Sequence, residues 1–132
     1  MKGLKILAMV FGLGVLTSCA HGTTDMEVLQ LQERNMETIL GLEMGVSEEQ
    51  AILRMGTPEI NEAYAQANGS KLVALFYYTN RVWADGLVTK DECTPLIFED
   101  NQLVGWGNEL YREKLKSALE KLPEDVSAPS DE

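Results

Sequence analysis

The sequence predicts an α+β domain in which two N-terminal helices precede a three-stranded antiparallel meander and an amphipathic helix follows it. Two observations lead to this prediction. Apolar residues recur first at helical spacing, then alternate in runs rich in aromatic and β-branched residues, and finally return to helical spacing. Glycine, proline, aspartate and asparagine separate these runs, as expected of residues that end helices and form turns.

Capping residues mark the two N-terminal helices. Thr24 and Glu27 have the spacing of a capping box, and Gly41 and Gly45 are expected to end the helix that they begin. Ser47 and Gln50 repeat this spacing and predict a second, shorter helix. Gly56, followed closely by Pro58, is expected to end this second helix.

The first strand of the meander is predicted over residues 71–83, KLVALFYYTNRVW, because both of its alternating faces are largely apolar. Asp85 and Gly86 form a two-residue hairpin signal after it. Pro95 has no N–H to donate, so regular pairing of the middle strand to both neighbours should begin after it. Residues 83–93 are therefore expected to form a projecting, partly irregular arm.

A second turn is predicted at residues 100–101, an Asp-Asn pair. This turn sets the register of the last two strands, with Phe98 opposite Leu103 and Pro95 opposite Trp106. The ring of Trp106 is accordingly expected in the core.

The third helix is predicted over residues 108–122, NELYREKLKSALEKL. Its apolar stripe consists of Tyr111, Leu115, Ala118, Leu119 and Leu122. Packing on its own domain is the favoured role, because amphipathic helices usually cover a core. Docking to a partner is the alternative.

The first residues have the composition of a secretory signal. Lys2 and Lys5 precede an apolar run of eleven residues, 6–16, which is shorter than the roughly 20 residues of a membrane-spanning helix. The Leu-Thr-Ser-Cys that ends at Cys19 resembles the bacterial lipobox, in which the cysteine is acylated and becomes the first mature residue. An ordinary signal peptide followed by an unrelated cysteine is the alternative. Residues 1–18 are interpreted as a lipoprotein signal peptide.

The residue after Cys19 bears on the destination of such a lipoprotein. An aspartate there would resemble the signal that retains lipoproteins in the inner membrane of Gram-negative bacteria, but the chain has Ala20. The expected location is therefore the outer membrane, on its periplasmic face. The acyl chains would hold the protein there without a spanning helix.

Composition limits the remaining chain. Residues 19–25 are interpreted as a tether, 26–122 as a single domain and 123–132 as a disordered acidic tail. Without the two lysines of the leader, 9 basic residues stand against 21 acidic ones, a net charge of −12. Such a charge should repel nucleic acid. The single histidine, His21, lies in the tether, so neither an enzyme nor a cofactor or metal site is expected.

A family resemblance lies in the run LGLEMGVSEEQAILRMGTPEI, residues 40–60. It is similar to the signature of the SmpA/OmlA lipoproteins, the small accessory subunit of the outer-membrane β-barrel assembly machinery, and keeps the motif residues Gly45, Gly56 and Pro58. Residues 40–107 more closely resemble a family of small bacterial lipoproteins classed only as a domain of unknown function. Both resemblances imply a helix-helix-meander fold, and neither brings a catalytic residue.

Cys93 is the one cysteine outside the predicted lipobox. Its neighbours Asp91 and Glu92 should oppose thiolate formation, whereas reactive cysteines usually have electropositive surroundings. A buried or half-buried packing role is favoured, and an intermolecular disulfide and redox chemistry are the alternatives.

Several carboxylates and one aromatic residue lie at or near the predicted turns. Five carboxylates suggest calcium as an alternative to simple solvation, namely Asp85, Asp91, Glu92, Glu99 and Asp100. Their spacing is not that of a calcium-binding loop, so solvated turn residues are favoured. Trp83 stands beside a hairpin tip, where a core role is hard to arrange. Trp83, Asp85 and Gly86 are therefore the candidate partner-binding residues.

These observations favour a noncatalytic outer-membrane lipoprotein that supports or regulates an envelope assembly through protein contacts. The second apolar face of the sheet needs the third helix, a second copy of the chain (a homodimer) or an envelope protein to cover it. A carrier or sensor of a small apolar ligand is one alternative and requires an enclosed apolar cavity. A periplasmic thiol protein is another and requires an accessible Cys93 of low pKa.

Overall fold

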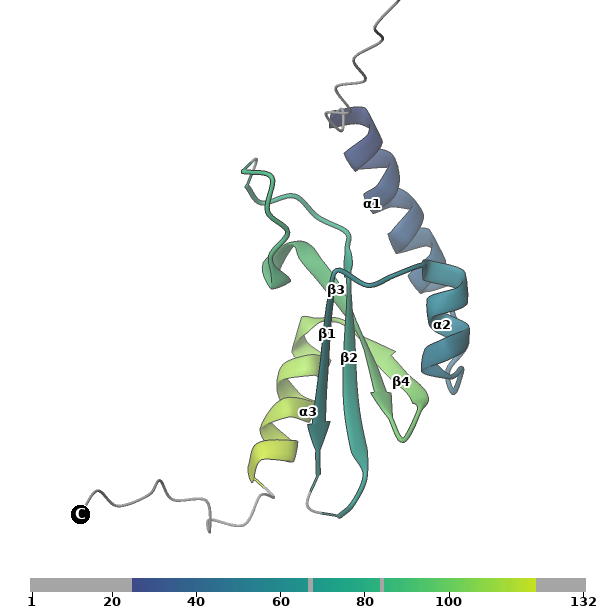
Figure 1. The fold of residues 1–132 in the computed structure, drawn as a ribbon, viewed down its shortest axis with the longest axis vertical. Helices are drawn as coiled ribbons and strands as arrows, with labels where there is room; N and C mark the ends of the chain where they lie inside the picture. The colour runs from purple at the N-terminus through teal and green to yellow at the C-terminus, as the bar shows by residue number, and fades with distance from the viewer. Residues whose placement is uncertain (1–24, 67, 84, 121–132) are drawn as a thin grey trace, which may run out of the picture.

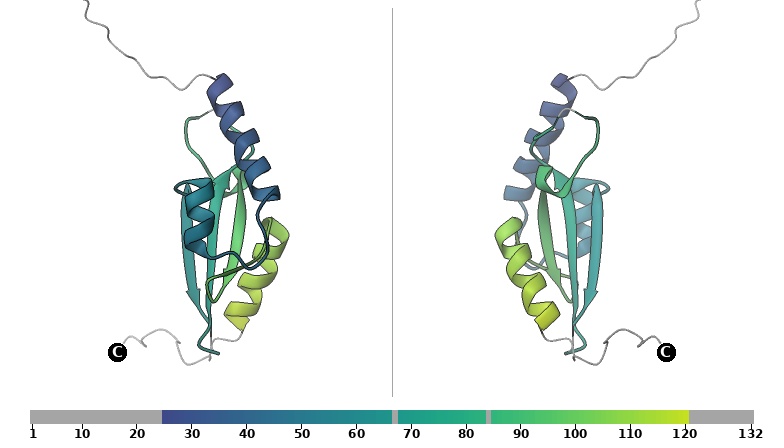
Figure 2. Two further views of the ribbon diagram at one scale, coloured as in Figure 1. Left: turned by 90° about the vertical axis from the view of Figure 1, so that its right-hand side faces the viewer. Right: turned by 90° about the vertical axis from the view of Figure 1, so that its left-hand side faces the viewer.

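The computed structural model describes residues 25–66, 68–83 and 85–120. They form a four-stranded antiparallel sheet with helices on both faces (Figure 1). Figure 2 shows α2 (Glu48–Met55) in front of the sheet from one side and α3 (Asn108–Glu120) in front of it from the other. The helix α1 (Asp25–Leu40) leads into α2 and extends past the end of the sheet. The α+β class is confirmed.

The sheet has a strand that the sequence did not predict. β1 (Ile60–Ala65) pairs antiparallel with β2 (Lys71–Tyr78), and the strand order is β1-β2-β3-β4. The three-stranded prediction was therefore wrong in its count. β1 lies at the edge, and its residues are alternately half-buried and exposed. Its sequence, INEAYA, lacks the apolar run that marks a strand with two covered faces.

The remaining strands correct the predicted boundaries. β2 ends at Tyr78, so residues 79–83 belong to the connection and not to the predicted strand. β3 (Cys93–Glu99) and β4 (Gln102–Trp106) flank a two-residue turn in which both residues have positive φ, 48° at Asp100 and 64° at Asn101. Aspartate and asparagine tolerate this conformation, which a tight hairpin turn requires. The turn at 100–101 is confirmed.

The register of β3 and β4 agrees with the prediction only next to the turn. Phe98 lies opposite Leu103, as expected. An irregularity between Ile97 and Phe98 then shifts the pairing, so that Trp106 lies opposite Leu96 rather than Pro95. Trp106 packs half-buried against the core.

Pro95 limits pairing on one side only. β3 pairs with β2 from Cys93 onward, and Pro95 lies opposite Phe76. On the β4 side pairing begins at Leu96. The carbonyl of Pro95 accepts the N–H of Gly107 at 2.9 Å. Since the N–H and C=O of one strand residue point to the same neighbour, the missing N–H also faces β4. The expected delay of pairing is therefore confirmed for β4 and wrong for β2.

Each face of the sheet has its own core. One core joins the end of α1, α2 and their connection to the sheet, and its buried residues include Ile39, Leu42, Val46, Ala51, Val73, Leu75, Tyr77, Leu96 and Phe98. The other contains Leu72, Ala74, Phe76, Tyr78, Cys93, Ile97, Tyr111 and Ala118. α3 thus covers the second apolar face, as favoured from the sequence. Its predicted stripe is wrong at Leu119, which is 52% exposed, and Leu122 lies outside the described residues.

The motif residues of the α1–α2 region have structural roles. Gly45 and Gly56 both have a φ of 85°, where residues with a Cβ are strained. The N–H of Gly45 donates to the carbonyl of Leu103 at 2.8 Å, which ties the helix connection to β4. The carbonyl of Gly56 accepts the hydroxyl of Tyr77 at 3.0 Å. Pro58 follows the end of α2 and is half-buried.

Candidate functional site

The loop between β2 and β3, residues 79–92, folds around one buried carboxylate. Glu92 is 1% exposed. Its Oε1 accepts the backbone N–H groups of Val82 at 2.9 Å and Trp83 at 3.0 Å, and its Oε2 accepts that of Thr89 at 3.1 Å. These hydrogen bonds, led by that of Trp83, hold the pKa of Glu92 below its ordinary value. The interpretation of Glu92 as a solvated turn residue was therefore wrong.

The tip of this β2–β3 loop presents the candidate partner-binding residues. Oδ1 of Asp85 accepts the N–H of Leu87 at 2.9 Å, and Gly86 has a φ of 79°. This local turn replaces the predicted two-residue hairpin, since no strand continues on either side of it. Trp83 is 67% exposed and Leu87 is 69% exposed. The structure thus brings Trp83, Asp85 and Gly86 together in one exposed loop.

A hollow of about 400 Å³ separates the loop from the N-terminal half of α1. Val28 and Leu31 of α1 line one side, and Trp83, Leu87 and Val88 line the other. These side chains give the hollow apolar walls that the sequence did not predict, because residues so far apart in the chain meet only in the folded molecule. The arrangement suits an apolar side chain or a small apolar molecule.

Charged groups border the same hollow. Nη1 of Arg81 donates to Oδ1 of Asp25 at 2.6 Å and so joins the loop to the first turn of α1. Glu59, just ahead of β1, is the other carboxylate of the lining. Because the Arg81–Asp25 pair is largely exposed, it orients the loop more than it stabilises the fold.

Cys93 lies behind the loop as the first residue of β3 and is 2% exposed. Burial, reinforced by the carboxylates of Glu59 and Glu92, raises the pKa of its thiol to about 12. The thiol is therefore neutral near pH 7 and fills the second core, the packing role favoured from the sequence. Among the described residues it forms no disulfide.

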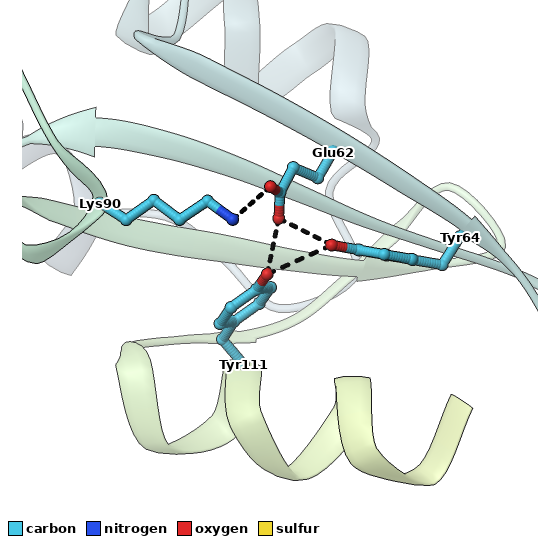
Figure 3. A network of polar contacts seen from close by, with 4 residues as sticks. All are labelled: Glu62, Tyr64, Lys90 and Tyr111. Atoms are coloured by element: carbon cyan, nitrogen blue, oxygen red, sulfur yellow. Dashed lines mark hydrogen bonds and ion pairs between the residues drawn. The ribbon is translucent and has the colours of Figure 1, made fainter. Parts of the chain in front are cut away.

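A second polar group lies between β1 and α3 (Figure 3). Oε2 of Glu62 accepts the hydroxyls of Tyr64 at 2.9 Å and Tyr111 at 2.6 Å, and the two hydroxyls lie 3.3 Å apart. Lys90, in the short 3₁₀ helix η1 (Lys90–Glu92), forms an ion pair with Oε1 of the same carboxylate. The Glu62 group thus connects the edge strand, the β2–β3 loop and α3.

The pKa shifts of the Glu62 group preserve its hydrogen bonds and its ion pair. Burial raises the pKa of Glu62, but the hydrogen bonds from Lys90, Tyr111 and Tyr64 outweigh it and leave the pKa below 4.5. Burial and the carboxylate raise the pKa of Tyr111, so its hydroxyl stays a donor. Both carboxylate oxygens are occupied by the protein's own donors, which leaves this group with a structural role. The sequence did not predict this group, because β1, which carries Glu62 and Tyr64, was not recognised as a strand.

Two further findings concern the described residues. None of their helices combines the length and apolar character needed to cross a bilayer. No group of three or more histidine, cysteine, aspartate and glutamate side chains among them is arranged to hold a metal ion. The predictions for Cys19, for the signal peptide, for the cap at Thr24 and for the acidic tail fall outside the described residues.

Comparisons with known proteins add one finding. A family model with the description "Protein of unknown function (DUF3192)" matches residues 13–113, which is more than half of the chain. No curated protein and no solved structure matches the chain. The match confirms the expected kinship with a domain family of unknown function.

Proposed function

The chain belongs to the DUF3192 family, whose description assigns no activity, and we propose from its site that it is a noncatalytic lipoprotein on the periplasmic face of the outer membrane. In this role it supports or regulates an envelope assembly through protein contacts. The partner would dock at the β2–β3 loop, over Trp83, Asp85 and Gly86.

One observation carries the proposal. Trp83 and Leu87 expose about two thirds of their side chains in a loop whose backbone is fixed by Glu92. Exposed aromatic residues on a fixed backbone are typical anchors of protein interfaces, because little conformational entropy is lost when a partner covers them. The hollow beside them, lined by Val28 and Leu31, offers a place for an apolar side chain of the partner.

The anchor is supported by the sequence around Cys19 and by the position of α1. The family match begins at residue 13 and therefore includes Cys19. α1 begins at Asp25, six residues after it, and six residues span at most about 21 Å. A lipid at Cys19 would hold the N-terminal end of α1, and with it the β2–β3 loop, close to the membrane surface. A partner at that surface would be within reach of the loop.

A relation to the SmpA/OmlA lipoproteins belongs to the same proposal. Two helices precede the sheet, as the resemblance implies. Gly45 and Gly56 adopt a φ that favours glycine, which gives the shared motif a backbone reason. The edge strand β1 adds to the three strands that the resemblance implies. Contact with the β-barrel assembly machinery is one form that the proposed protein contacts would take.

Site-specific photocrosslinking in intact cells tests the docking site. A photoreactive residue in place of Trp83 should give a defined crosslinked partner, whereas the same residue in place of Leu119 should not. Leu119 is a matched control because it is also apolar and half exposed, at 52%, but lies on α3. Equal crosslinking from both positions would show that Trp83 marks no specific interface.

Truncation separates binding from folding at the same position. Trp83→Ala should lose the crosslinked partner of a neighbouring photoreactive residue at Leu87 while changing the free energy of unfolding by less than about 0.5 kcal/mol. Trp106→Ala should cost about 1 to 3 kcal/mol, less than a fully buried tryptophan would, because its ring is half-buried against the first core. A domain that unfolds on loss of Trp83 would place the loop in the core and exclude the proposed site.

The anchor has its own test. Replacing Cys19 with Ala should block acylation and release any processed chain into the soluble periplasm, and mass analysis of the wild-type chain should show an acyl modification at Cys19. An unmodified mature N-terminus at another residue would refute the lipoprotein part of the proposal and leave the protein contacts to be judged by crosslinking.

A second candidate function is the binding of a small apolar ligand or lipid in the hollow. The hollow is open on one side and lined by Asp25, Glu59 and Arg81 as well as by apolar side chains, and it therefore suits a lipid with a polar end. Its volume of about 400 Å³ lies within the range of roughly 300 to 1,000 Å³ of ligand sites. A fluorescent fatty acid should then bind the purified chain saturably, and Leu31→Trp should block it by filling the hollow. If the fatty acid does not bind saturably, the ligand-binding function is contradicted, and the docking of a protein partner remains the proposed role of the hollow.

A further inference from the structure

α1 has a second apolar face that points away from the domain. Met26, Leu29, Met36 and Leu40 are between 37% and 64% exposed. With Glu33 they repeat at alternating spacings of three and four residues, which places all five along one side of the helix. This surface, residues 26, 29, 33, 36 and 40, is named the outer stripe.

The outer stripe is distinct from the two surfaces of α1 already described. The helix packs on its domain through Gln32, Asn35 and Ile39, which are buried. At 100° per residue the stripe is centred roughly 110° around the helix from these residues. None of its members lines the hollow beside the β2–β3 loop. The stripe therefore needs a separate explanation, since methionine and leucine at helical spacing are typical of surfaces that accept another helix.

Glu33 lies at the centre of the outer stripe. Its side chain is exposed and has no hydrogen bond or ion pair within the part of the chain that the structure describes. Two apolar residues precede it and two follow it along the stripe. Any occupant that covers the stripe must therefore pair with a central carboxylate or leave it desolvated, which is costly.

This position argues against a second copy of the chain. A parallel copy aligned in register brings Glu33 against Glu33, and an antiparallel copy, in which the spacings of three and four residues are reversed, still leaves Glu33 among apolar residues without a cation. Two facing carboxylates at a core position repel each other. Glu33 therefore disfavours the pairing of two outer stripes from two copies of the chain.

The charges of α1 also argue against a lipid surface. α1 carries Asp25, Glu27, Glu33 and Glu37 against the single cation Arg34. Helices that lie in a membrane interface usually have lysine and arginine on the polar face, attracted by anionic lipids. A carboxylate in the middle of the apolar stripe would also have to enter the interface.

We propose that the outer stripe docks an amphipathic helix of a partner protein, in which apolar residues meet Met26, Leu29, Met36 and Leu40 and a central lysine or arginine pairs with Glu33. The apolar residues supply the buried area, and the pair of charges selects the partner and its register. Glu37, exposed next to the stripe, adds a second negative charge for a cationic helix. This contact is separate from the β2–β3 loop, so a failure of the docking site there would not contradict it.

Two synthetic helical peptides test the proposal on the purified full chain. Both carry leucine at the heptad a and d positions, with one central a position occupied by lysine in the first peptide and by glutamate in the second. The lysine peptide should bind at least about tenfold more tightly in fluorescence anisotropy, because like charges at such a site cost several kcal/mol. In Glu33→Lys the preference should invert. In Glu113→Lys, the same exchange at an exposed site on α3, it should stay unchanged.

Two further variants complete the test. Leu29→Asp should lose both peptides while its melting temperature stays within error of the wild type, because the side chain is exposed. Glu33→Leu should make the chain dimerise in sedimentation analysis. The proposal is overturned if the wild-type chain already dimerises through the stripe, if neutral phosphatidylcholine vesicles bind it in place of the peptides, or if Glu33→Lys leaves the preference unchanged.

Discussion

Cys93 and Glu92 are neighbours in the chain and are both buried, yet the fold keeps the first neutral and the second ionised. The thiol of Cys93 lies in the second core, where burial raises its pKa. The carboxylate of Glu92 receives three backbone N–H groups, which lower its pKa. Burial thus keeps the thiol of Cys93 neutral, whereas the backbone hydrogen bonds that Glu92 accepts keep its carboxylate ionised. A neutral thiol beside an ionised carboxylate that holds the loop indicates a structural role for both residues.

At this scale Cys93 gives a direct prediction. Cys93→Ser should lower the free energy of unfolding by about 1 to 3 kcal/mol, because the hydroxyl is buried without a partner. Cys93→Ala should cost less, because it introduces no polar atom. Urea unfolding of both variants measures the difference. Rapid labelling of native Cys93 by a thiol reagent at neutral pH would contradict the burial on which this expectation rests.

At the scale of elements, short connections fix how the helices meet the sheet. Ser47 and Gln50 form the predicted capping box that begins α2, and Gly56 ends this helix with its N–H on the carbonyl of Ile52 at 2.8 Å. On the other face, Nζ of Lys114 lies 3.1 Å from Oε2 of Glu99 and links α3 to β3. Backbone conformation thus ends α2, and an ion pair adds to the packing of α3 on the sheet.

Gly56→Ala tests the backbone part of this account. At a φ of 85° and a ψ of −166°, a residue with a Cβ is strained by about 1 to 3 kcal/mol, although the added Cβ meets no atom within 4 Å. The denaturant midpoint should fall accordingly. Gly41→Ala is the matched control, since its Cβ would make ordinary contacts with helix carbonyls at 3.5 and 3.6 Å. Equal effects at both positions would rule out backbone strain as the reason for glycine at position 56.

At the scale of the whole molecule, the Glu62 group joins parts that are far apart in sequence. Glu62 of β1 binds Lys90 of the β2–β3 loop and Tyr111 of α3. Lys90 also lies over the ring of Phe76, 5.4 Å from its centroid. The group therefore couples the edge strand and the loop to the helix that covers the second face, and its protonation affects the global stability.

The pH dependence of unfolding follows from the direction of the pKa shift. Because the folded pKa of Glu62 lies below 4.5, its carboxylate stabilises the fold fully above about pH 4.5, and this contribution is lost as the pH falls through the folded pKa. The stability difference between the wild type and Glu62→Gln should therefore be largest near neutral pH and shrink below pH 4.5 in thermal melts. Glu113→Gln, at an exposed site, should show no such change. A constant difference from pH 7 to pH 3 would contradict the role of the ionised carboxylate.

The sequence by itself determined the features that depend on neighbouring residues. The capping box at Ser47, the stop at Gly56 and Pro58, the turn at 100–101 and the burial of both faces of β2 were all predicted. Each follows from local hydrogen bonds, from a backbone conformation or from the periodicity of apolar residues. The exposure of Trp83 also followed from its place near a turn.

Only the tertiary structure decided the features that depend on distant residues. β1 is too polar to be marked as a strand alone and is held by its pairing with β2. The register shift after Ile97 moved Trp106 away from Pro95. Glu92 resembled a solvated turn residue until the N–H groups of the β2–β3 loop enclosed it. In each case the favourable partner lies elsewhere in the chain, and the energy that selects the conformation exists only once the two segments are packed together.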